Sequence, residues 1–227
     1  MSNASRGWIG SWWGRSTSTR RVTGLPTGIV AGAFLAVLAS ATPGAAQIIL
    51  NANPGPANNG GSAGWAIFFD LTSTGPISVT QMTTANTAAA NATFTVEVFR
   101  RVGTALGGPV GSGPGSSPAG WTSLGTATAT QGPVASGVSL PIDIPDIALV
   151  GGQLTGIAVL FTGAGPRYFG TGSPPLGTYS DANLTLVTGE ARSAPFTTGG
   201  TWFSSRELVG SITYVPVPVE LMGVGIE

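Results

Sequence analysis

The chain of 227 residues carries a narrow set of charged side chains: nine arginines, nine aspartates or glutamates, and no lysine, histidine or cysteine. Charged residues make up 8% of it, against roughly 25% in ordinary globular domains. Without histidine, cysteine and lysine, the sequence excludes histidine-activated nucleophiles, Schiff-base chemistry and zinc sites built from Cys and His. Beyond residue 46, five arginines face nine acids, a net charge of −4 (5 − 9). Such a chain lacks the basic surface that a nucleic-acid partner requires.

Residues 1–46 have the pattern of a signal peptide. Four arginines and no acid precede an apolar run at residues 28–39, and the small residues Gly44-Ala45-Ala46 follow it. This order predicts cleavage before Gln47. The apolar run is shorter than the roughly 20 residues of a spanning helix. We therefore expect export to the cell surface or the extracellular space, with no stable membrane span after cleavage.

Residues 47–214 are expected to form one all-β domain. Short apolar–polar alternations are separated by clusters of Gly, Pro, Asn and Ser, which is typical of an antiparallel β-sandwich, jelly-roll-like, with about eight or nine strands. The best-marked strand covers residues 64–72 and is apolar on most of both faces, which places it in the middle of a sheet. Its expected core face consists of Trp65, Ile67, Phe69 and Leu71, and its other face of Ala66, Phe68 and Asp70.

The remaining predicted strands are short, and one of them is marked by proline. Pro141 and Pro145 indicate that the strand at 138–144 is an edge or bulged strand, and Asp143 and Asp146 fit a turn around Pro145. The other strands are predicted at 47–51, 77–79, 94–99, 121–130, 154–161, 167–170, 184–187 and 208–214.

The segment from Gly103 to Gly120 is rich in glycine, proline and serine and is too long for an ordinary hairpin loop. It is either a mobile functional loop or a tolerated insertion. Because it has no bulky anchor residues, we expect the insertion.

Several short motifs of residues 47–214 resemble a β-sandwich domain of bacterial secreted and surface proteins, often of unassigned function. The resemblance implies an extracellular sandwich without a catalytic signature. It is carried by Phe68-Phe69-Asp70-Leu71, Trp121–Gly125, Tyr179–Leu186, Gly189-Glu190, Pro195-Phe196, Ser205-Arg206 and Gly210–Tyr214.

The tail, residues 215–227, begins Val215-Pro216-Val217-Pro218, a pattern that favours an extended polyproline conformation. It resembles the start of the C-terminal sorting signal of PEP-CTERM proteins. The tail departs from that signal, because Pro218-Val219-Glu220 replaces Pro-Glu-Pro and neither the long apolar helix nor the terminal arginine cluster follows. We expect release rather than anchoring.

Carboxylates are the only candidates for acid–base chemistry. A glycoside hydrolase needs two of them facing one sugar, but the acids of the domain are scattered along the chain. They are Asp70, Glu97, Asp143, Asp146, Asp181, Glu190 and Glu207.

No cofactor is expected, with one alternative. Asp181, Asn183 and Glu190 offer the oxygen ligands that calcium prefers. Asp181-Ala182-Asn183 equally fits an Asx turn that leads into the next strand.

The candidate ligand-binding residues are Trp202, Tyr168 and Arg206. The pairs Trp202-Phe203 and Tyr168-Phe169 could form an aromatic platform for sugar rings, or place one member in the core and the other at the rim. Arg206 could clamp an anionic ligand, or pair with an internal acid, Asp181 or Glu190.

These features favour a secreted, non-enzymatic β-sandwich that serves as a matrix, surface or adhesion component. The alternative is a carbohydrate-binding module, and a carboxylate-pair glycoside hydrolase is a more distant third hypothesis. The expected partners are extracellular polysaccharide or other matrix proteins.

Overall fold

The structure is a computed structural model, and it describes residues 46–170 and 177–218. The expected leader up to residue 45 and the tail beyond residue 218 lie outside the described residues. Within those ranges the chain forms fourteen β-strands and one 3-10 turn (η1, Pro114–Ser116), and no α-helix. No helix there is long and apolar enough to cross a membrane. The all-β prediction is confirmed, but the number of strands exceeds the eight or nine expected.

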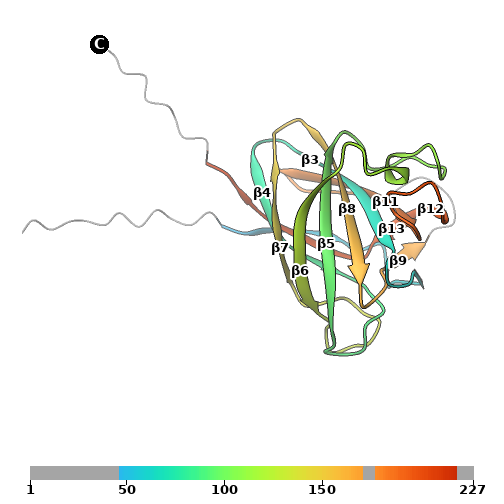
Figure 1. Ribbon diagram of the computed structural model, residues 1–227. Helices are drawn as coiled ribbons and strands as arrows, with labels where there is room; N and C mark the ends of the chain where they lie inside the picture. The colour runs from blue at the N-terminus through green and yellow to red at the C-terminus, as the bar shows by residue number, and fades with distance from the viewer. Residues whose placement is uncertain (1–45, 171–176, 219–227) are drawn as a thin grey trace, which may run out of the picture. The chain divides into compact units, whose positions relative to one another are not determined.

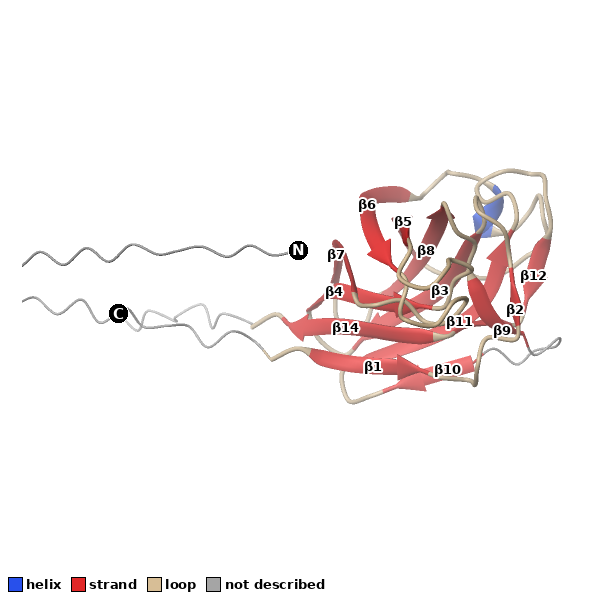
Figure 2. Cartoon of the chain, turned by 90° about the horizontal axis from the view of Figure 1, so that it is seen from below, coloured by secondary structure: helices blue, strands red, loops and turns tan. Residues whose placement is uncertain are grey.

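Two antiparallel sheets pack face to face as a sandwich (Figures 1 and 2). The smaller sheet has the order β1 (Ile48–Ala52), β14 (Gly210–Pro216), β4 (Ile77–Thr84), β7 (Ile142–Leu149). The larger sheet has the order β10 (Gly177–Ser180), β11 (Leu184–Arg192), β3 (Ala66–Ser73), β8 (Leu154–Thr162), β5 (Thr93–Val102), β6 (Thr122–Thr130), and β12 (Trp202–Ser204) pairs with the end of β11. A third, small sheet contains β13 (Arg206–Leu208), β9 (Arg167–Gly170) and β2 (Asn59–Gly60).

The core lies between the two main sheets, and β3 contributes to it as predicted. β3 is flanked by β11 and β8 in the interior of the larger sheet. Its residues Ile67, Phe69 and Leu71 are at most 2% exposed and belong to the main apolar cluster. The prediction that Trp65 lies on the core face was wrong. β3 begins only at Ala66, and the Trp65 ring is half-buried at the rim.

β7 is the edge strand that the prolines predicted. It forms one margin of the smaller sheet, and its pairing with β4 is interrupted between Val79 and Gln81. The predicted start of this strand, at residue 138, was wrong. Val138 and Leu140 precede β7, and their side chains are 41% and 47% exposed.

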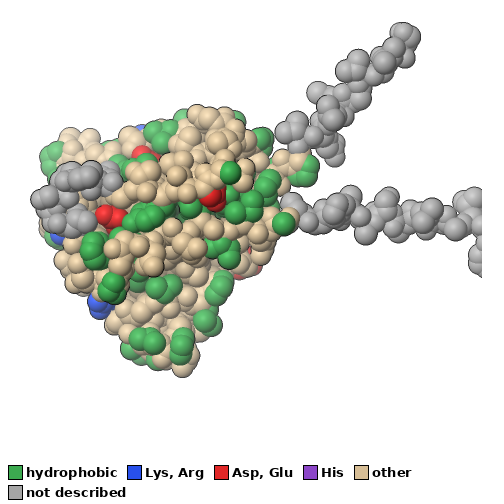
Figure 3. Space-filling model, turned by 180° about the vertical axis from the view of Figure 1, so that it is seen from behind, with side chains coloured by type: hydrophobic (Ala, Val, Ile, Leu, Met, Phe, Trp, Pro, Cys, Tyr) green, Lys and Arg blue, Asp and Glu red, His purple; other side chains and the backbone are tan. Residues whose placement is uncertain are grey.

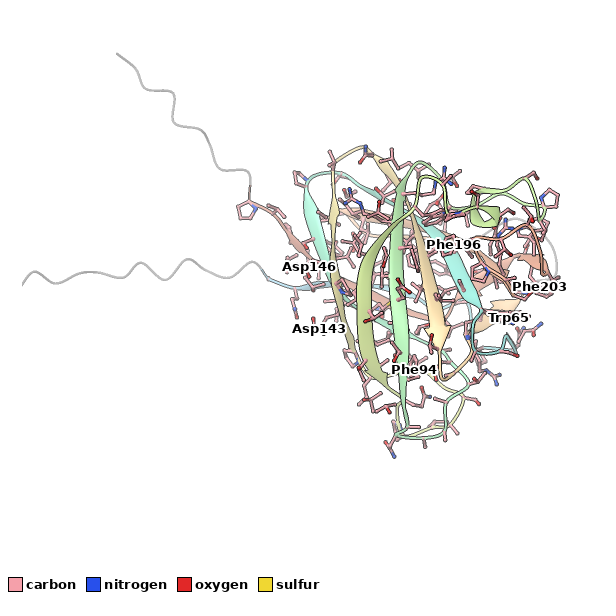
Figure 4. The ribbon with its side chains drawn as sticks, viewed as in Figure 1. Trp65, Phe94, Asp143, Asp146, Phe196 and Phe203 are labelled. Carbon is pink, nitrogen blue, oxygen red and sulfur yellow. The ribbon has the colours of Figure 1, made fainter. Side chains whose placement is uncertain are left out.

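The prediction that Asp143 and Asp146 lie in a turn was also wrong. Both lie within β7 and are exposed (Figure 4). They share the outward side because the interrupted pairing shifts the alternation by one residue.

The two ends of the described chain leave the sandwich on the same side. β1 and β14 pair antiparallel, with Ile48 opposite Tyr214. The first residues of β1 therefore lie beside the last residues of β14 (Figure 2). The opposite end of the molecule faces away from both exits.

The main core predicts a clear contrast between two leucines. Leu71 is fully buried, so Leu71→Ala should lower the free energy of unfolding by about 2–5 kcal/mol through lost burial and a cavity. Leu140→Ala removes the same atoms from an exposed site and should change it by less than about 0.5 kcal/mol. Urea unfolding followed by circular dichroism measures both values. Equal losses would contradict the assignment of β3 to the core.

Candidate functional site

The segment 103–120, here called the strap, covers part of the outer face of the larger sheet (Figure 1, green, upper right). Beneath it a second apolar cluster is buried, separate from the main core. The cluster contains Ala66 and Phe68 from β3, Ala158 from β8 and Ala105 from the strap, with Phe99, Leu106, Trp121, Leu160 and Phe196 packed around them. The strap is therefore not a neutral insertion, because it closes a core of its own.

Asp70 binds the first part of the strap. Its side chain is on the outer face of β3 and is 6% exposed. Its Oδ1 accepts a hydrogen bond from the backbone N–H of Ala105 (2.6 Å), and its Oδ2 accepts one from the hydroxyl of Thr104 (2.5 Å). The one charge in an otherwise apolar strand thus has a structural partner.

Glu190 and Arg192 bind the middle of the strap from β11. The backbone N–H of Gly107 donates to Oε1 of Glu190. Arg192 donates from Nη1 to the hydroxyl of Ser116 (2.9 Å) and from Nη2 to the carbonyl oxygen of Gly107 (3.2 Å). Arg192 also forms the only ion pair among the described residues, with 3.6 Å between its Nη2 and Oε2 of Glu190.

Asp70, Glu190 and Arg192 are here called the clamp, and they share a buried environment. Glu190 and Arg192 are each 2% exposed, and Glu190 is the diagonal neighbour of Asp70 across the β3–β11 pair. Burial raises the pKa of Asp70 against the lowering effect of Thr104, Ala105 and Arg101. Burial likewise raises the pKa of Glu190, and the nearby Asp70 charge adds to it. Burial also lowers the pKa of Arg192.

A pair of interacting carboxylates with raised pKa values has the appearance of a catalytic site. The geometry indicates a different role. The strap lies over both acids, and each already accepts hydrogen bonds from the strap backbone. A substrate would have to displace the strap to reach them.

Two of the other described acids accept hydrogen bonds from neighbouring side chains. Glu97 accepts a hydrogen bond from Ser123 (2.6 Å), and Glu207 accepts one from the hydroxyl of Tyr179 (2.7 Å). A groove of about 270 Å³ beside β1 and β14 has no charged side chain in its lining. Its lining residues are Asn51, Ala52, Asn53, Thr83, Val138, Val209, Gly210 and Ser211.

Asp181 and Asn183 form the turn between β10 and β11. Oδ1 of Asp181 accepts hydrogen bonds from the backbone N–H groups of Asn183 (2.8 Å) and Leu184 (2.9 Å), and the hydroxyl of Tyr214 donates to Oδ2 (2.8 Å). Burial raises the pKa of Asp181, but these hydrogen bonds outweigh it and hold the pKa below its ordinary value. This is the Asx turn that the sequence offered as the alternative to calcium.

Glu190 does not lie with these two residues. Leu184, beside the turn, pairs with Ser73, whereas Glu190 pairs with Phe68, five residues farther along β3. That is roughly 17 Å at 3.4 Å per residue. Asp181, Asn183 and Glu190 therefore do not form one metal site, and no three His, Cys, Asp or Glu side chains gather elsewhere in the described ranges.

Tyr168 and Arg206 are structural in this geometry. The Tyr168 side chain is 2% exposed and belongs to the main core, so it is not available to a ligand. The Arg206 guanidinium lies 5.7 Å from the Tyr168 ring centroid and 5.6 Å from that of Phe203. Its Nη1 donates to the carbonyl oxygens of Ser204 and Ser205. Neither Asp181 nor Glu190 pairs with Arg206, contrary to the expected internal ion pair.

The half-buried aromatic side chains at the rim pack on one another and on glycines. Trp65 and Phe203 stack with their centroids 5.2 Å apart (Figure 4), and the backbone of Gly61 lies against the Trp65 ring. Trp202 packs on Gly108 of the strap so closely that a Cβ at Gly108 would overlap its ring. These contacts occupy much of the ring surface that a sugar would need, which weakens the aromatic platform.

The larger sheet has an open outer surface beyond the strap, here called the threonine face. Thr93 lies opposite Thr130, and Thr95 opposite both Thr128 and Thr162. The alternating residues of β5 and β6 point into the core, so these hydroxyls face solvent, exposed or half-exposed. The threonine face consists of Thr93, Thr95, Thr126, Thr128, Thr130 and Thr162.

Sequence reasoning missed Arg192 and the strap residues that it binds. A signal was present: Glu190 and Arg192 are two residues apart in a strand and so share a face. Asp70 interrupts the apolar pattern of the neighbouring strand in the same way. Two strands with charges among buried residues indicate that the charges meet partners inside the fold.

No protein-family model matches the sequence, and no curated protein matches it at a significant level. The function must therefore be argued from the chemistry of the chain itself.

The clamp predicts a pH dependence of stability. Because the folded-state pKa values of Asp70 and Glu190 are raised above 3.8 and 4.5, their stabilising contribution is full below those values. It is lost as the pH rises through the raised values. The free energy of unfolding should therefore decrease as the pH rises above 4.5, and Asp70→Asn should flatten that slope. Urea titrations across this range test it, with the exposed Asp146→Asn as control. An unchanged slope in Asp70→Asn would contradict the prediction.

Calcium is expected to leave the melting temperature unchanged, because Glu190 is too far from the Asp181 turn to complete a site. Thermal unfolding with added calcium and with EDTA measures this. A rise that EDTA reverses, and that Asp181→Asn abolishes, would restore the calcium hypothesis.

Proposed function

We propose that this protein is a secreted, non-enzymatic β-sandwich that serves as a surface, matrix or adhesion component. The observation that supports this proposal best is that buried charged side chains bind other parts of the same chain. The two acids that interact with each other, Asp70 and Glu190, are covered by the strap and hydrogen-bonded to it. A scaffold uses buried carboxylates in this way to fix a loop, whereas a hydrolase presents them to its substrate.

The surface also fits a role in contact with uncharged material. The threonine face offers hydroxyl and methyl groups, and the face seen in Figure 3 has few charged side chains among many small polar and apolar ones. The export expected from residues 1–46 brings such a surface into contact with the envelope or the matrix. The two chain exits on one side leave the opposite end available to partners.

Secretion is tested by expressing the full chain in a bacterial host and fractionating the culture. We expect the protein outside the cytoplasm with Gln47 as its first residue. A Leu35→Arg variant, which interrupts the apolar run, should stay in the cytoplasm with its leader intact. Cytoplasmic retention of the unaltered chain would contradict the proposal.

The alternative, a carbohydrate-binding module, is favoured by one observation, the open row of hydroxyls on the threonine face. Retention on insoluble cellulose or chitin tests it. Thr128→Lys should reduce retention if the threonine face binds the glycan, with Thr178→Lys on the exposed part of β10 as control. Loss only in Trp202→Ala would assign binding to the aromatic rim instead.

No retention of the unaltered protein on either polysaccharide would contradict the carbohydrate alternative and leave the protein-contact role. The same incubations measure reducing ends, which should not increase. An increase that Glu190→Gln abolishes would favour the glycoside hydrolase.

A further inference from the structure

The strap is attached to the sandwich by the clamp and by hydrogen bonds of its own backbone. In the clamp, Asp70 and Glu190 accept backbone N–H groups of the strap, and Arg192 donates to Ser116 and Gly107. Outside the clamp, the N–H of Gly103 donates to the carbonyl oxygen of Leu154 in β8, and the carbonyl oxygen of Gly115 accepts from the N–H of Phe196. Its apolar attachment is the small second cluster, to which it gives Ala105 and Leu106. No residue of the strap belongs to the main core. Removing the strap from the sheet would thus leave the main core intact.

The strap ends in two glycines that can act as hinges. Gly103 has a φ of +84° and Gly120 a φ of +77°, and a Cβ at either position would meet nothing within 4 Å. Glycine adopts this left-handed backbone without a steric penalty, so both ends can change their backbone angles at low cost once the hydrogen bond from Gly103 to Leu154 opens. Five more glycines lie between the hinges, at 107, 108, 111, 113 and 115.

We propose that the strap opens as one unit about Gly103 and Gly120 while the two sheets stay folded, and that the clamp sets the equilibrium between the closed and the open form. Opening uncovers the surface beneath, with Phe68 and the second apolar cluster next to two carboxylates and one guanidinium. Local opening of a weakly attached segment is the physical basis of many binding surfaces that are hidden at rest.

The direction of the pH effect follows from the groups around each acid. Asp70 faces Thr104, Ala105, Arg101 and the charge of Glu190. Burial in the closed form raises its pKa, so the closed form binds a proton more tightly than the open form does. By linkage, the open form gains population as the pH rises.

The same reasoning applies to Glu190. It faces the N–H of Gly107, Trp202, Arg192 and Asp70, and burial is the largest effect on its pKa, upward. Both acids therefore favour closure on acidification, and Arg192 holds the strap through neutral acceptors as well.

Hydrogen exchange read by mass spectrometry tests the proposal on the purified chain. Peptides that contain Ala105 and Gly107 should exchange through an opening that low urea does not change, whereas β3 and β8 peptides exchange only through global unfolding. As the pH rises above 4.5, the strap opening, corrected for intrinsic exchange, should increase. Strap peptides that exchange with the same urea dependence as β3 would overturn the proposal.

A variant identifies the clamp as the cause. Thr104→Ala removes the hydroxyl that donates to Asp70 from an exposed residue, so the fold should survive, and strap exchange should become roughly tenfold faster. Thr126→Ala, on the threonine face, is the matched control and should leave strap exchange unchanged. Equal strap exchange in Thr104→Ala and the unaltered chain would overturn the role of the clamp.

Discussion

Strand β3 carries large apolar side chains on both faces, so exposing either face to water would be unfavourable. The architecture follows from that constraint. Its inner face, with Phe69 and Leu71, packs into the core between the two sheets. Its outer face carries Phe68, whose ring would be exposed in a simple two-layer sandwich. Trp121 and Phe196 contact this ring edge-on at 5.8 and 6.0 Å between centroids. Burying a phenylalanine side chain contributes roughly 1.5–3 kcal/mol, so a cover over this face is favourable.

The cover brings a second requirement, because Asp70 lies on the same face. A buried carboxylate without hydrogen bonds is strongly destabilising. The backbone N–H of Ala105 and the hydroxyl of Thr104 meet this need, and the strap in turn needs partners for its own carbonyl oxygens. Arg192 supplies one of them at Gly107. The strap and the clamp thus depend on each other, because each supplies hydrogen-bond partners to buried polar groups of the other.

The exclusive use of arginine has a physical reason in this fold. Among the described arginines, only Arg192 forms an ion pair. Arg206 packs between two rings, and Arg101 lies 5.5 Å from the ring centroid of Trp121. Arg100 and Arg167 donate to the carbonyl oxygens of Ala148 and Ala57. A planar guanidinium can stack and donate at the same time, which a lysine ammonium cannot do. The described arginines therefore mainly pack against rings or donate to carbonyl oxygens of the same chain. The surface that remains for contact with partners consists mostly of neutral side chains.

The sequence by itself determined the fold class, most of the long strands and the central place of β3, because alternation and turn residues are local signals. The sequence did not predict the short strands β2, β10, β12 and β13, since two to four residues carry little periodic signal, although β9, also of four residues, was predicted. The sequence also predicted that segment 103–120 is an insertion, because most of its anchors are backbone groups and small hydroxyl side chains, which are common in any loop. Only the tertiary structure decided that Asp70, Glu190 and Arg192 meet under this segment, and that Glu190 lies far from Asp181. Contacts between residues distant in the chain depend on sheet order and register, and no local pattern encodes these.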